Sequence, residues 1–138
     1  MIRRISFIFI ILLTIFISKS FSFENKIIIK VDNEIITSVD ILNESNYIKA
    51  MNKNLQDLNK NQLWKISLNS ITKDKIKKIE LLNNIEKIEL DSDNSNKIIT
   101  SIYQRFGFEN LKDFKYHLNS FNVDYNFFEE KVAIETLW

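Results

Sequence analysis

The first 22 residues constrain the fold most, because they have the pattern of an export signal and leave the rest of the chain to form the domain. Arg3 and Arg4 precede the almost wholly apolar run Ile5–Ile17. Ser20–Ser22 then places a serine at each end of the segment ahead of a possible cleavage point before Phe23. This order of charge, apolar run and small residues is typical of a secretory signal peptide. The run is shorter than the roughly 20 residues that span a bilayer.

An uncleaved N-terminal anchor is the alternative, since Lys19 and the bulky Phe21 make a less favourable cleavage region. In both cases the remaining chain works outside the cytoplasm. We therefore predict a signal peptide over residues 1–22 and a single domain over residues 23–138, a length that supports one modest apolar core.

Charge and cysteine content narrow the partners of this domain. Without residues 1–22 the chain loses three basic and no acidic side chains, so its formal net charge changes from +1 to −2. No strong positive field remains to attract nucleic acid or an anionic membrane, and we expect no nucleic-acid partner. The chain has no cysteine, so an exported domain of this size depends on its apolar core rather than on disulfides.

The chain offers few groups for catalysis. His117 is its single histidine, and it has one glycine and no proline. A nucleophile–histidine arrangement has to use His117, which we place at the solvated boundary of a helix. A Gly-rich phosphate loop and a histidine-based metal site are excluded. Asp91 and Asp93 favour a helix start, and Glu129 and Glu130 a solvated face. We predict no enzyme activity, no catalytic residue, no metal and no cofactor.

The sequence predicts a mainly α-helical domain with a short N-terminal β-hairpin. Two β-prone runs, Lys26–Val31 and Glu34–Thr37, flank Asp32 and Asn33, which tolerate a left-handed backbone. Gly107 stands where a helix C-terminus needs a left-handed residue. The predicted helices cover about Val39–Lys53, Gln62–Asn84, the Asp91–Ser95 cap cluster to Phe106, Leu111–Asn119, and Tyr125 to near Trp138.

The longest predicted helix has an apolar and a basic side. Its four lysines between positions 73 and 78 are interleaved with Asp74 and followed by Glu80, a pattern that favours a solvated face over a nucleic-acid site. We expect its apolar side to carry Leu63, Trp64, Leu68, Ile71, Ile79 and Leu82.

The last predicted helix is apolar on two opposite sides. One stripe contains Phe128 and Val132 and begins at Tyr125, whereas Phe127, Ile134 and Trp138 lie roughly opposite. Such a helix needs two apolar partners. The domain core is one of them, and the second is more core, another chain or a bound client.

The order of these segments resembles the N-terminal domain of the SurA family of periplasmic chaperones, over most of the chain that follows the signal. Lys30–Asp40 resembles the family's opening strand, turn, strand and acidic helix start, although Glu34 stands where the family often has glycine. The other similar segments are Ile71–Leu82, like the family's long helix; Ile88–Asp93, like its short link; and Phe108–Leu118 with Val123–Val132, like its short helix and the start of the next amphipathic helix.

The resemblance implies a multi-helix domain that binds unfolded outer-membrane proteins in the periplasm and assists their folding or delivery without ATP. Many members carry parvulin-type isomerase domains after this one. The chain stops at Trp138 and lacks the paired histidines of a parvulin, so isomerase activity is not implied. The alternatives are a structural or interaction subunit and a truncated remnant of a parvulin-type peptidyl-prolyl isomerase.

The resemblance also implies a C-terminal segment that returns to complete the domain, which this sequence lacks. We therefore expect the second apolar face of the last helix to take such a segment, a partner chain or a client. The candidate client- or partner-binding residues are Trp64, Phe127, Ile134 and Trp138.

Overall fold

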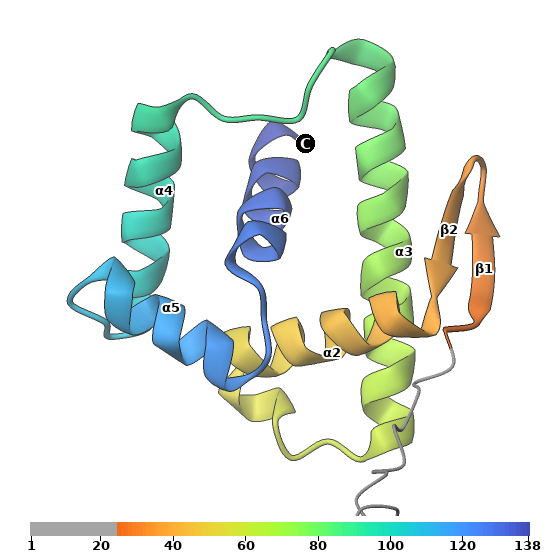
Figure 1. Cartoon of the computed structure of the whole chain (residues 1–138), viewed down its shortest axis with the longest axis horizontal. Helices are drawn as coiled ribbons and strands as arrows, with labels where there is room; N and C mark the ends of the chain where they lie inside the picture. The colour runs from red at the N-terminus through yellow and green to blue at the C-terminus, as the bar shows by residue number, and fades with distance from the viewer. Residues whose placement is uncertain (1–24) are drawn as a thin grey trace, which may run out of the picture.

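The computed structural model describes residues 25–138, and the predicted signal peptide lies outside them. This part of the chain is mainly helical with one antiparallel hairpin, which confirms the predicted class of fold (Figure 1). The elements are β1 (Ile27–Val31), β2 (Glu34–Thr37), α2 (Ser38–Met51), the 3-10 turn η1 (Lys53–Leu55), α3 (Lys60–Asn84), α4 (Ser92–Arg105), α5 (Leu111–Ser120) and α6 (Tyr125–Leu137).

Local turn and cap chemistry sets the boundaries of these elements. Asp32 adopts a φ of 52° in the hairpin turn and Gly107 a φ of 84° after α4, as the sequence predicts. Thr37 caps α2 in a reciprocal arrangement, because its side chain accepts the backbone N–H of Asp40 while the Asp40 carboxylate accepts that of Thr37. The side chains that cap the other α-helices are Asn59, Asp91, Asn110 and Asp124.

Two apolar clusters hold the elements together. The larger one lies where α4, α5 and α6 meet the end of α2, and it is centred on Phe114 and Phe128, whose rings meet edge to face at 5.2 Å. The smaller cluster joins β2, α2 and α3 through Ile36, Ile41 and Ile71. In Figure 1, α6 stands between α3 and α4, so both of its sides face helices.

A buried ionic cluster joins α6 to the two helices that cross beside it. Lys131 of α6 donates hydrogen bonds to Glu44 of α2 and to Asp74 of α3. All three residues are buried, and the Lys131 ammonium also lies 4.5 Å from the centroid of the Tyr47 ring. Oε1 of Glu44 accepts no hydrogen bond from the residues that the structure describes.

The buried side of α3 differs from the prediction. Asp74 lies inside the fold rather than on a solvated face, because it pairs with Lys131. Leu82 is exposed, and Leu81 is buried in its place. The true buried side includes polar residues, so a search for apolar periodicity alone selects a stripe rotated around the helix. Its members are Leu63, Ser67, Ile71, Asp74 and Leu81.

We expect Lys131→Met to lower the free energy of unfolding by about 3–5 kcal/mol, because it leaves two buried carboxylates without their cation. Chemical denaturation followed by circular dichroism measures this change. Lys87→Met is the matched control, since Lys87 pairs with Glu89 at the surface and its loss changes stability by less than about 0.5 kcal/mol.

Replacing all three charged residues at once distinguishes the cost of an unpaired buried charge from the cost of lost side-chain packing. The triple variant Glu44→Leu, Asp74→Val, Lys131→Met removes all three charges and recovers most of the stability that the single change loses. A single variant as stable as the native chain would contradict a structural role for the cluster.

Candidate polypeptide-binding site

An apolar groove runs between α2 and the first turns of α3, with a volume of about 250 Å³. Leu42 and Trp64 form its exposed apolar rim, and the Trp64 side chain remains 37% exposed. Ile41 and Leu63 are buried beneath them. We call this the Trp64 groove, and its lining residues are Ser38, Ile41, Leu42, Ser45, Asn46, Lys49, Lys60, Leu63 and Trp64.

A buried pair of hydroxyl groups fixes the distance between the two walls of this groove. Ser45 of α2 donates to the backbone oxygen of Ile41 at 2.7 Å, so the hydroxyl of Ser67 on α3 donates to Ser45 Oγ at 2.8 Å. Small side chains at this point let the helices approach closely, and each buried hydroxyl has a partner. The groove is therefore built on two rigid helices rather than on loops.

The charge of the Trp64 groove has one sign. Among residues 25–138, its charged lining residues are Lys49 and Lys60, and no carboxylate from that range lines it. An apolar floor with cationic edges suits a ligand that presents an apolar side chain next to a negative charge.

The structure separates the four residues predicted to bind clients or partners. Trp64 lies in the groove, whereas Ile134 is only 4% exposed and is part of the interior. Phe127 is half-buried, with its ring edge to face on Tyr47 at 6.0 Å and beside the Lys131 ammonium. The second apolar stripe of α6 is thus covered along most of its length, and Phe127 and Ile134 also line a cavity of about 160 Å³ that α2, α3 and α6 enclose.

Trp138 differs from the other members of its stripe because it is 60% exposed. The ammonium of Lys77, in the C-terminal half of α3, lies 6.0 Å from its ring centroid. The Trp64 groove is formed by the N-terminal turns of the same helix, so the two tryptophans belong to separate surfaces. Leu82 and Leu137 are also exposed on the elements that carry Lys77 and Trp138.

The sequence analysis missed Leu42, Lys49 and Lys60. Leu42 is the position after the buried Ile41, so it falls beside the apolar stripe of α2 rather than on it. An apolar residue next to such a stripe is the signal that points to an exposed rim. Nothing in the sequence indicates that the two lysines share a groove, since only the crossing of α2 and α3 brings them together.

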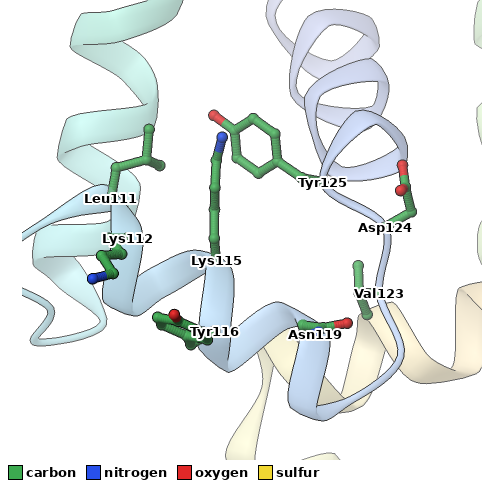
Figure 2. A pocket seen from close by; sticks show the side chains of 8 residues that line it. All are labelled: Leu111, Lys112, Lys115, Tyr116, Asn119, Val123, Asp124 and Tyr125. Atoms are coloured by element: carbon green, nitrogen blue, oxygen red, sulfur yellow. The ribbon is translucent and has the colours of Figure 1, made fainter.

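A second, more open groove lies between α5 and the start of α6, with a volume of about 510 Å³. Figure 2 shows Lys115 standing beside the Tyr125 ring, and its ammonium is 3.7 Å from the ring centroid. Lys112 faces Tyr116 in a longer cation–π pair of 5.9 Å. Each of these lysines is already paired with an aromatic ring through a cation–π contact. The lining of this groove is also more polar than that of the Trp64 groove.

The His117 side chain is held by a polar contact and by packing against aromatic rings. Its Nε2 atom lies 2.8 Å from the backbone oxygen of Ala50, and its ring is packed among aromatic side chains of α5 and its flanking turns. Within residues 25–138, no three histidine, aspartate or glutamate side chains are placed to hold a metal ion. None of the helices in that range is long and apolar enough to cross a membrane.

Comparison with known proteins adds no relatives, because no family model, no curated protein and no solved structure matches the chain.

Tyr125 provides a pH-dependent test of the α5–α6 region. Burial, and then the charge of Glu129, raise the pKa of Tyr125 to about 12. The folded state holds this proton more tightly than the unfolded state. The protonated Tyr125 therefore makes its full contribution to the free energy of unfolding below pH 10, and this contribution is lost as the pH rises toward 12. The difference in absorbance at the phenolate band between the native chain and Tyr125→Phe measures the midpoint, and Glu129→Gln lowers it. A midpoint near 10 in the folded protein would contradict this environment.

Proposed function

We propose that this domain binds extended apolar segments of unfolded polypeptide in the periplasm, without ATP, and that outer-membrane proteins in transit are its clients. The observation that carries the proposal is the Trp64 groove, an apolar site with an exposed aromatic rim. The resemblance of the segment order to SurA N-terminal domains and the predicted export signal support the same function.

The size of the groove fits reversible holding. It accepts one or two side chains, and burial of one large apolar side chain contributes about 1.5–3 kcal/mol. A single contact of this strength gives weak binding, because micromolar affinity needs about 8 kcal/mol. A client is therefore released without an energy source, and several apolar segments in one chain raise its total occupancy.

A structural or interaction subunit is the second candidate function. The exposed Trp138, which directly follows the exposed Leu137 at the end of α6, favours this alternative. Large apolar side chains gathered on one surface are typical of protein-binding sites. Sedimentation of the purified domain distinguishes the two, since a stable dimer that is lost in Trp138→Ala supports the subunit.

We expect Trp64→Ala to weaken the binding of an unfolded apolar peptide by at least about tenfold, because the aromatic rim is lost. Anisotropy of a labelled peptide measures the affinity. Suppression of aggregation when a urea-unfolded outer-membrane protein is diluted measures the holding activity. Tyr116→Ala is the matched control, because Tyr116 is an exposed aromatic residue on α5, outside this groove.

Equal affinity in the native chain and in Trp64→Ala would reject the groove as the binding site. Absence of both peptide binding and aggregation suppression in the native domain would reject the proposed function. A Trp138→Phe background leaves Trp64 as the single tryptophan, so its fluorescence reports directly on occupation of the groove.

Export is tested separately. We expect the chain, expressed in a bacterium with two membranes, to be recovered from the periplasmic extract with Phe23 as its first residue. Mass spectrometry of the intact protein measures the cleavage point. Recovery of the full-length chain in the membrane fraction would favour the uncleaved anchor instead.

A further inference from the structure

Strand β1 presents an apolar outer edge. Within residues 25–138 the sheet has two strands, and β1 is the outer strand in Figure 1, although Val31 at its end packs against the cluster that contains Ile71 of α3. The isoleucines at positions 27 to 29 are all exposed, and Ile27 reaches 67%. Ile35 of β2 is exposed as well, whereas Ile36 is completely buried. Among the described residues no other strand pairs with this edge, so the outer backbone N–H and C=O groups of β1 can pair with an added strand.

The edge and the Trp64 groove adjoin each other. Ser38 lines the groove, and its backbone N–H donates to the backbone oxygen of Lys26 at 2.8 Å. Ser38 Oγ in turn accepts the backbone N–H of Lys26 at 3.0 Å. Thus the start of β1 is tied directly to a wall of the groove, and a chain that pairs with β1 reaches the groove within a few residues.

The charges along this surface select its partner. Lys26 and Lys30 are exposed at the two ends of the isoleucine run, and Lys49 and Lys60 line the groove. A segment that carries carboxylates between apolar residues pairs favourably with Lys30, Lys49 and Lys60.

We propose that β1 takes up an extended segment of a bound polypeptide as a third strand, and that this segment alternates apolar with acidic residues. The pairing rests on the proposed function, since the same segment places an apolar side chain in the Trp64 groove. Main-chain hydrogen bonds then supply affinity that is independent of sequence, while the groove and Lys30, Lys49 and Lys60 supply selectivity. This combination suits a protein that holds many different unfolded chains.

The experiment compares short synthetic peptides in the Trp138→Phe background. The probe alternates glutamate with valine and carries one phenylalanine. A second peptide has the same sequence with N-methyl groups on alternate amides, which removes donors along one edge. A third peptide has lysine in place of glutamate. Hydrogen exchange of the β1 amides and Trp64 fluorescence report on the edge and the groove separately.

We expect the N-methylated peptide to bind at least about tenfold more weakly than the probe, because it loses several backbone hydrogen bonds of about 0.5–1.5 kcal/mol each. The β1 amides exchange more slowly with the probe bound. The lysine peptide binds more weakly than the probe, and Lys30→Glu reverses this preference. Lys97→Glu, an exposed change on α4, leaves the preference unaltered.

Each result decides the proposal. If the probe changes Trp64 fluorescence but N-methylation and Lys30→Glu leave its affinity unchanged, strand addition is rejected while the proposed function stands. If no peptide changes Trp64 fluorescence, both are rejected. Protection of the β1 amides that rises with protein concentration alone would show that a second copy occupies the edge, which also overturns the proposal.

Discussion

The bridge from Lys131 to Glu44 and Asp74 constrains three helices at once, because it joins them at one buried point. Removing charges from water is costly, so such a cluster persists only when every helix stays in place. It therefore fixes the register of α6 against α2 and α3. The charges also act on their surroundings, since burial, Glu44 and Asp74 together raise the pKa of Tyr47 well above its usual range.

The same cluster helps to shape the candidate binding surface. Glu44 precedes Ser45, and Ser45 bonds to Ser67 at the base of the Trp64 groove. Asp74 lies two turns beyond Ser67 on α3. The ion pairs and the hydroxyl pair therefore tie α2 to α3 along one side, while the groove opens on the other. A site with walls held in this way needs little ordering when a ligand binds, which reduces the entropic cost of weak contacts.

The features that the sequence predicts are those that depend on residues close together in the chain. Thr37, Asp91, Asn110 and Asp124 cap helices because each side chain reaches backbone N–H groups within three residues, and Gly107 ends α4 for a reason equally local. Trp64, which the sequence analysis names as a binding candidate, lies on the exposed rim of the groove. The buried side of α3 and the enclosure of Ile134 depended on partners distant in sequence. Asp74 and Lys131 are of residue types that usually lie at the surface, and their burial follows only from the contact between α3 and α6.

The hairpin illustrates how a stable interior and an open edge can coexist in one small domain. Ile36 is buried with Ile41 and Ile71, and Glu34 forms an ion pair with Lys75 that lowers the pKa of its carboxyl group. These contacts anchor β2 on α3. Val31 of β1 packs against the same cluster, so the hairpin is held on α3 while the isoleucines at positions 27 to 29 remain exposed. An isolated hairpin is marginally stable, so this anchoring is what allows an apolar edge strand to persist and to meet a partner.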